Sequence, residues 1–170
     1  ASSNPSFFFN YNGSPYFSAN TGSGNVLHVT DGTESGTTAT GGDFVFNPAE
    51  LSGLIYYINT TDANGLYEFN GTTQVKVANV GTEDVNFIGA AFTVLNNKIL
   101  GYGFTATDDP IVGRELYEYN PATDTYTLIK DITGDATDSG ISNFMVVGNE
   151  LYFESGSGIL WKTDGTNSGT

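Results

Sequence analysis

The segment Leu160–Thr170, LWKTDGTNSGT, has a near-copy in Leu27–Thr37, LHVTDGTESGT. The two segments align without a gap and share the pattern TDGT-x-SGT. Weaker copies lie between them, in GLYEFNGTT around Leu66 and GRELYEYNPATDT around Leu116. The four leucines at the matching position are 39, 50 and 44 residues apart. This near-even spacing indicates a tandem repeat of about 44 residues.

Each repeat consists of short strand-like runs separated by turn residues. In the last repeat the runs are Tyr126–Ile132, Asn143–Val147, Glu150–Ser155 and Ile159–Thr163. They are rich in β-branched and aromatic residues, whereas glycine and asparagine lie between them. Apolar side chains occur at both odd and even positions, so we expect both faces of each sheet to be covered. Four-stranded antiparallel units at this period are typical of β-propeller blades.

The sequence therefore predicts an all-β protein, built as a propeller-like array of four-stranded antiparallel blades. An open β-solenoid or a sandwich of the same hairpins is the alternative. We expect a single repeat domain over residues 1–170, with repeats at 1–37, 38–77, 78–125 and 126–170. The last repeat is incomplete because it lacks its fourth strand, and we expect the chain to be a fragment of a longer array.

The composition excludes several classes of partner. Among 170 residues there are 5 Lys+Arg and 19 Asp+Glu, which gives a net charge of −14. We expect no binding to nucleic acid, because phosphate backbones are bound by clustered basic residues. No apolar run is long enough to span a bilayer, so we expect no direct membrane insertion. The absence of cysteine excludes disulfides and zinc–thiolate sites.

The repeats resemble those of secreted and cell-surface bacterial proteins, in which ELWKSDGT-x-x-GT is followed by TVLVKDI, a Gly/Ser loop and LTxVNGxLYFSADD. The matching segments here include LWKTDGTNSGT and YTLIKDITGDATDSGISNFMVVGNELYFES. The resemblance covers nearly the whole chain. It is strong in the first and last repeats and degenerate in the middle ones, where FNGT and YNPATDT replace TDGT. It implies a propeller-like fold and an extracellular or cell-surface location, and it provides no catalytic residues.

From these observations we expect a non-enzymatic extracellular module that acts in adhesion or surface assembly. Its expected partners are other repeats of the same or a neighbouring chain, together with glycans or surface proteins. One alternative is a lectin-like, carbohydrate-binding propeller, with or without calcium as its cofactor. The other is the accessory propeller of a larger secreted hydrolase. We predict no catalytic residues and no cofactor besides calcium, because the single histidine, His28, lies at a repeat position and no nucleophile elbow is present.

Two acidic regions are candidate sites. Asp131, Asp135 and Asp138 surround one glycine-containing loop and are the candidate calcium ligands, since calcium prefers oxygen donors. A solvated acidic surface is the alternative. Asp108 and Asp109 lie in an insertion of the third repeat, where departures from a scaffold often place binding residues.

The remaining candidates are an aromatic residue and the repeated turns. Trp161 is a candidate ligand-binding residue, because aromatic rings stack on sugars, although strand aromatics more often pack in the core. Asp31-Gly32 and Asp164-Gly165 are predicted to be structural turns: the aspartate bonds to nearby backbone N–H groups and the glycine adopts a positive φ. Calcium binding or sugar binding at these aspartates is the alternative.

Overall fold

The computed structural model describes the chain apart from residues 1–2, 23, 41–45, 60–64, 78–85 and 157. It is all-β with antiparallel strand pairing, and the described residues include one short helix. As far as the described residues go, the sheets are not closed into a barrel or a propeller. The chain divides into two compact units, Ala1–Lys76 and Val77–Thr170.

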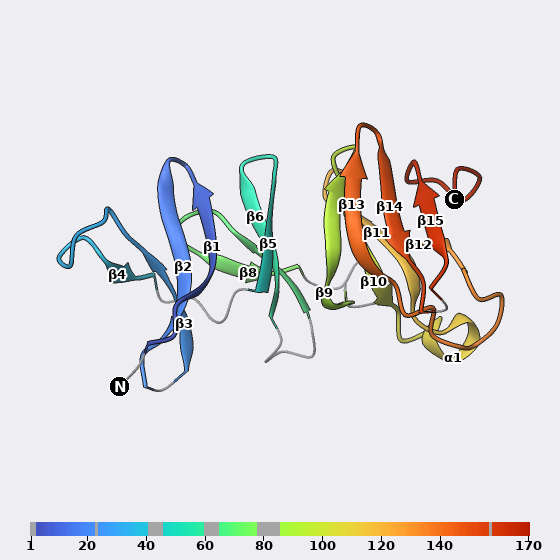
Figure 1. Ribbon diagram of the computed structural model, residues 1–170, viewed down its shortest axis with the longest axis horizontal. Coiled ribbons are helices and arrows are strands. Elements are labelled where there is room, and N and C mark those ends of the chain that lie inside the picture. Colours follow the sequence, from blue (N-terminus) through green and yellow to red (C-terminus); the bar gives the residue numbers. More distant parts are fainter. Residues whose placement is uncertain (1–2, 23, 41–45, 60–64, 78–85, 157) are drawn as a thin grey trace. The chain divides into compact units, whose positions relative to one another are not determined.

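The first unit contains two four-stranded meanders, in which strands pair in chain order (Figure 1). Meander 1 contains β1 (Ser6–Tyr11), β2 (Ser14–Asn20), β3 (Asn25–Val29) and β4 (Thr38–Ala39). Meander 2 contains β5 (Phe46–Leu51), β6 (Leu54–Asn59), β7 (Gly65–Phe69) and β8 (Gln74–Lys76). The fourth strand of each is short, because only two or three residues pair before the chain leaves the sheet.

The second unit contains meanders 3 and 4. Meander 3 contains β9 (Asn86–Leu95), β10 (Lys98–Phe104), β11 (Glu115–Asn120) and β12 (Thr125–Lys130), with helix α1 (Asp109–Val112) inserted before β11. Meander 4 contains β13 (Ser142–Val147), β14 (Glu150–Glu154) and β15 (Leu160–Thr163). The sequence predicts that new repeats begin at residues 38 and 126, but β4 pairs with β3 and β12 pairs with β11, so these strands complete meanders 1 and 3. The predicted boundary at residue 78 borders a segment outside the described residues.

The four leucines that mark the repeat lie in the third strand of their meanders. Each is paired with the residue at the matching place in the second strand: Ser18↔Leu27, Ile58↔Leu66, Tyr102↔Leu116 and Glu154↔Leu160. The repeats found in the sequence are therefore equivalent in strand register. We call the face of a meander that carries this leucine its leucine face, and the other its opposing face.

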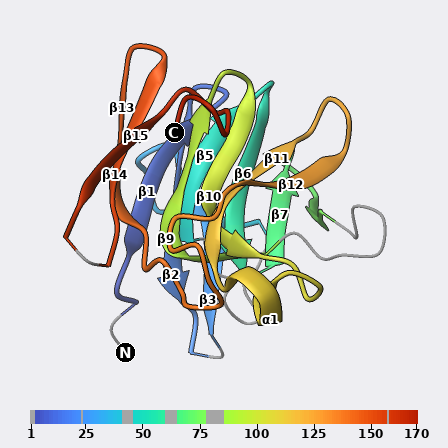
Figure 2. The same cartoon turned by 90° about the vertical axis from the view of Figure 1, so that its right-hand side faces the viewer.

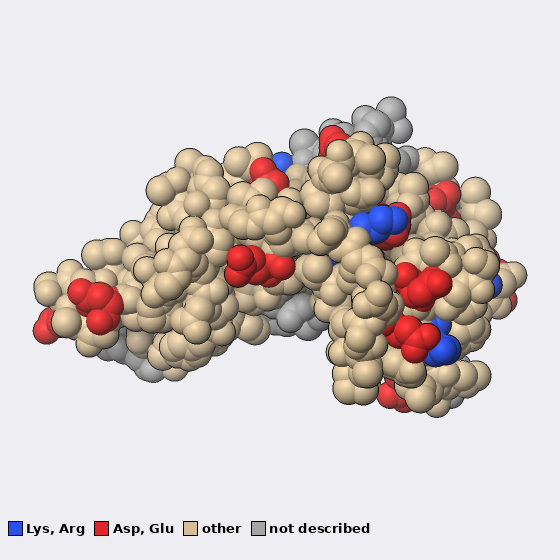
Figure 3. Space-filling view, turned by 90° about the horizontal axis from the view of Figure 1, so that it is seen from above, with Lys and Arg blue, Asp and Glu red and all other residues tan. Residues whose placement is uncertain are grey.

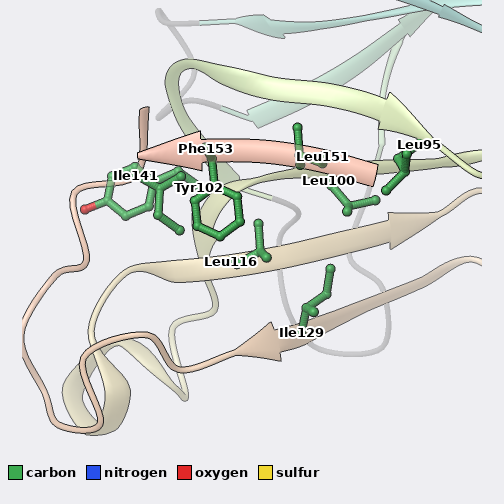
Figure 4. Close-up of a cluster of buried hydrophobic side chains, with 8 residues drawn as sticks. All are labelled: Leu95, Leu100, Tyr102, Leu116, Ile129, Ile141, Leu151 and Phe153. Atoms are coloured by element: carbon green, nitrogen blue, oxygen red, sulfur yellow. The ribbon is translucent and has the colours of Figure 1, made fainter. Parts of the chain in front are cut away.

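Both units have a core in which a leucine face packs on an opposing face. In the first unit, Tyr11, Tyr16 and Leu27 of meander 1 pack with Ile55, Tyr57 and Phe69 of meander 2. In the second, Leu95, Leu100, Tyr102, Leu116 and Ile129 of meander 3 pack with Leu151 and Phe153 of meander 4 and with Ile141 just before it (Figure 4). Both cores form because the apolar residues of neighbouring strands line up in rows across each sheet.

Candidate functional site

The two TDGT segments form loops with the same hydrogen bonds. Asp31 Oδ1 accepts bonds from the backbone N–H and the hydroxyl of Thr33, at 2.9 and 2.8 Å. Asp164 Oδ1 accepts the same bonds from Thr166, at 2.9 and 2.7 Å. These bonds, first the one from the threonine hydroxyl, lower the pKa of both carboxyl groups. Each carboxylate is therefore engaged within its own loop.

The loop is longer than the tight hairpin turn that Asp-Gly predicts. In the first unit it occupies the seven residues between Thr30 and Thr38, the first residue of β4. A hydroxyl–hydroxyl bond closes it, Thr30–Thr37 at 2.7 Å, and the second unit has Thr163–Thr170 at 2.8 Å. The hydroxyl-rich sequence stabilises the longer loop, because serine and threonine hydroxyls replace backbone partners.

Two glycines in each loop are required for different reasons. Gly32 and Gly165 have φ of 90° and 93°, which an L side chain rarely adopts. Gly36 and Gly169 lie outside this region, but a Cβ at either position would collide with the carboxylate of Asp31 or Asp164. The spacing of the TDGT-x-SGT pattern thus follows from the packing of the loop around its aspartate.

The candidate calcium ligands lie on the loop between β12 and β13 and bind different partners. Asp131 Oδ1 accepts the N–H of Gly134 at 2.6 Å. Asp135 Oδ1 accepts the N–H and hydroxyl of Thr137, at 2.8 and 2.6 Å. Within the described residues no group of three or more His, Cys, Asp or Glu side chains is placed to hold a metal ion. The structure therefore does not bring Asp131, Asp135 and Asp138 together as one metal site, and calcium binding stays a prediction.

Asp108 and Asp109 lie at the start of α1 and anchor the insertion. The hydroxyl of Tyr117 donates to Asp108 Oδ2 at 3.0 Å. Burial, reinforced by this bond, raises the pKa of Tyr117. Asp109 Oδ1 lies 3.7 Å from Nε of Arg114. Both carboxylates therefore have partners within the second unit.

Arg114 connects the insertion to the loop between β12 and β13 that carries Asp131, Asp135 and Asp138, which we call the acidic loop. The insertion and the acidic loop run beside each other in Figures 1 and 2. Its guanidinium lies 3.7 Å from Asp138 Oδ2 and 5.5 Å from the ring centre of Phe104, close enough for a cation–π contact. Its backbone N–H donates to Asp138 Oδ1 at 3.0 Å, and its carbonyl accepts bonds from the N–H and hydroxyl of Ser139, at 3.0 and 2.9 Å. Asp138 and Ser139 are thereby fixed against the beginning of β11.

Glu115, the next residue, is completely buried and holds the other end of the loop. Its Oε2 accepts the N–H of Ile132 at 2.8 Å, and its Oε1 accepts the hydroxyl of Thr133 at 3.1 Å. Burial raises the pKa of Glu115, while these hydrogen bonds oppose the shift. A buried carboxylate that accepts several hydrogen bonds fixes the loop conformation.

A pocket of about 290 Å³ lies beside this loop. Its lining residues come from the acidic loop, the end of β14 and the start of β15: Ile132, Thr133, Asp138, Ser139, Ser155, Gly156, Ile159 and Trp161. Two of the predicted site residues, Asp138 and Trp161, are thus brought together. The other candidate aspartates of the insertion and of this loop do not line the pocket: Asp108, Asp109, Asp131 and Asp135.

The pocket combines an indole with hydroxyl groups and one carboxylate. The ring of Trp161 stacks on Phe153, with centroids 6.5 Å apart and planes 9° from parallel. The Nε1 atom of Trp161 is buried and makes no hydrogen bond to the described residues, whereas the carboxylate of Asp138 is exposed. An apolar wall with a few fixed polar groups is the arrangement that small polar ligands use.

Several residues of this site were not predicted. Thr133, Ser139 and Ser155 belong to loops in which serine and threonine are common, so nothing in the sequence distinguishes them. One feature of the sequence could have indicated that Glu115 holds this loop: it is a carboxylate that directly precedes the repeat leucine, Leu116.

The surface of the protein is acidic. Figure 3 shows Asp and Glu distributed over one face, where Lys and Arg lie beside some of them. Two of the basic residues form ion pairs on meanders, Lys98–Glu118 and Lys162–Glu150, both at 2.7 Å. Among the described residues, no helix has the length and apolar character needed to cross a membrane.

Comparisons with known proteins give little guidance. No protein-family model matches the chain, and no curated protein matches it. One solved chain, from a structural and mechanistic analysis of two prolyl endopeptidases, is similar over 91% of the present chain, at 11% identity and a TM-score of 0.40. The present chain spans 32% of that chain. A likeness this distant does not bear on function.

Proposed function

We propose that the chain is a non-enzymatic, propeller-like repeat module of a secreted or cell-surface bacterial protein, and that it acts in adhesion or surface assembly. The observation that supports this proposal best is the repeated interface, in which a leucine face packs on the opposing face of the next meander in both units. Arrays of this kind grow by adding equivalent units and present their connecting loops for binding. The resemblance of the TDGT repeats to those of extracellular bacterial proteins supports the location.

The chemistry of the pocket favours binding over catalysis. Its one carboxylate, Asp138, accepts a hydrogen bond from the backbone of Arg114. Glu115 behind it is completely buried and bonded to the loop. A glycosidase needs two carboxyl groups that both reach the substrate, one of them as an acid or a nucleophile.

The experiment that tests the location and the activity uses the source bacterium. Intact cells are treated with a protease that cleaves after glutamate, and the released peptides are identified by mass spectrometry. We expect peptides of this chain from intact cells, and beads coated with the purified chain should adhere to those cells in competition with soluble chain. Peptides found only after lysis, together with no adhesion of the beads, would contradict the proposal.

The pocket at Trp161 favours carbohydrate binding as a second candidate function. The exposed Asp138 carboxylate can accept hydrogen bonds from hydroxyl groups of a sugar that contacts the partly exposed part of the Trp161 ring. A glycan array with wild-type chain, with and without calcium, tests this function. Binding of a defined glycan would support it, and no binding in either condition would exclude it.

A further inference from the structure

The leucine face of meander 4 is exposed although its counterpart is packed. Leu160, Met145 and Val147 lie on this face and are 72%, 60% and 54% exposed. In meander 3 the residues at the positions of Leu160 and Val147 are Leu116 and Leu95, and both are buried in the contact with meander 4. A face with the register of a packed interface is therefore open to solvent.

The opposing face of meander 1 carries an exposed ring at one end of a half-buried aromatic row. The rings of this row are stacked, Phe8–Phe17 at 5.6 Å and Phe17–His28 at 5.4 Å between centroids. Phe8 is 68% exposed. We call Phe8, Phe17 and His28 the aromatic row.

Meander 4 has the same row at equivalent positions, and there it is packed. Phe144, Phe153 and Trp161 have centroid distances of 6.0 and 6.5 Å, and they lie in the core against the leucine face of meander 3. The equivalence extends to the irregularity in the first strand, because the register shifts between Ser6 and Phe9 in β1 and between Ser142 and Met145 in β13.

We propose that two copies of this chain associate head to tail, with the leucine face of meander 4 in one copy packed on the aromatic row of meander 1 in the next. These two faces are the two halves of the interface that each unit already contains. A second copy supplies the missing half of each, with the same strand register. Such a contact is heterologous, so each added copy leaves one face of each kind free and the assembly grows further.

The charged groups on the leucine face of meander 4 have partners within their own sheet. Glu154, which lies opposite Leu160 where meander 3 has the buried Tyr102, accepts a hydrogen bond from Asn143 at 3.0 Å. The ion pair Glu150–Lys162 of meander 4 stands at the positions of Lys98–Glu118 in meander 3, with the signs reversed. Lys162 is therefore neutralised within its own sheet, as is Lys98 in the packed meander. The proposal deepens the proposed function in surface assembly by naming the partner.

The test measures molar mass by sedimentation velocity over a wide range of protein concentration. We expect the mass of the wild type to rise beyond that of a dimer with concentration. Leu160→Asp and Phe8→Asp should each weaken association at least about tenfold, because a carboxylate would have to be buried in the contact. Ile111→Asp is the matched control, since Ile111 is 65% exposed on α1 and lies on neither face. It should associate like the wild type.

Mixing the two variants tests the head-to-tail geometry. Leu160→Asp keeps an intact aromatic row and Phe8→Asp keeps an intact leucine face, so an equimolar mixture should form a dimer while each variant alone stays monomeric. A wild type that is monomeric at every concentration, or variants that associate like the wild type, would overturn the proposal. A mixture that stays monomeric would also overturn it. None of these outcomes affects the test of cell-surface location, so the two proposals fail separately.

Discussion

Leu116 and Leu160 occupy the same position in the third strand of neighbouring meanders, yet Leu116 is fully buried and Leu160 is 72% exposed. Their cross-strand partners are also equivalent, Tyr102 and Glu154. Leu116 is buried because meander 4 packs on the leucine face of meander 3. Leu160 is exposed because, among the described residues, no sheet packs on the leucine face of meander 4.

This pair provides a direct test of the repeat register. Leu116→Ala should lower the free energy of unfolding by about 2–5 kcal/mol, because it leaves a cavity in the core. Leu160→Ala should change it by less than about 0.5 kcal/mol, as surface substitutions do. Urea denaturation of dilute protein measures both. Equal losses at the two positions would show that the leucine face of meander 4 is covered in solution.

The glycine before the last threonine of the TDGT loop should be intolerant of any side chain. Gly169→Ala should destabilise the second unit by about 1–3 kcal/mol, since its Cβ would collide with the carboxylate of Asp164. In the background of Asp164→Ala the same substitution should cost much less, and the double-mutant cycle measures this coupling. Ser168→Ala, in the same loop, is the control and should be nearly neutral. Additive effects of Gly169→Ala and Asp164→Ala would reject the role assigned to the collision.

The pKa of Asp164 should depend on one hydroxyl. Thr166→Val removes the hydroxyl that contributes most to the lowered pKa of Asp164, so this pKa should rise toward its ordinary value. A carboxyl group with a lowered folded pKa stabilises the fold above its unfolded pKa, and this stabilisation is lost as pH falls through the folded pKa. The variant should therefore lose less stability on acidification. NMR titration of the side-chain carboxyl carbons follows both aspartates, and Asp31 in the same sample is the control that should not move.

Glu115 should make stability fall as pH rises. Its pKa is raised by burial, so the folded state binds more protons than the unfolded state between the ordinary value of 4.5 and the raised value. Stability therefore decreases as pH rises through this window. Glu115→Gln removes the titrating group, so this part of the pH dependence should disappear. Thermal unfolding of both proteins across the window provides the comparison, and parallel profiles would show that the carboxyl group of Glu115 does not titrate there.

The fluorescence of Trp161 should report on ligand binding, since it is the only tryptophan in the chain. A glycan that occupies the pocket should shift or quench this emission in a saturable way, and Asp138→Asn should weaken its binding about tenfold by removing a charged acceptor. Asp135→Asn is the matched control, because Asp135 lies on the same loop but does not line the pocket. An unchanged spectrum with a glycan that binds the chain would place the binding site elsewhere.

Much of the strand pattern was predictable because it depends on local chemistry. The runs Tyr126–Ile132 and Glu150–Ser155 are predicted as strands from their apolar residues and the turn residues beside them, and the structure has strands there, β12 (Thr125–Lys130) and β14 (Glu150–Glu154). The structural equivalence of Leu27 and Leu160 was visible in the sequence, because the same loop requires the same residues.

The candidate site was only partly predictable. Asp138 and Trp161 were candidates for different reasons, and only the packing of the acidic loop beside β15 brings them into one pocket. The same packing separates Asp138 from Asp131 and Asp135, whose carboxylates bind their own loop.

By itself the sequence determined the all-β class, the repeat period and the residues of the TDGT loop, because strand alternation and turn geometry are properties of neighbouring residues. Only the tertiary structure decided which leucine is buried, which meander receives β12 and which polar side chains share a pocket. These outcomes depend on contacts between residues far apart in the chain, and two closely similar local sequences differ in burial when only one has a neighbouring sheet.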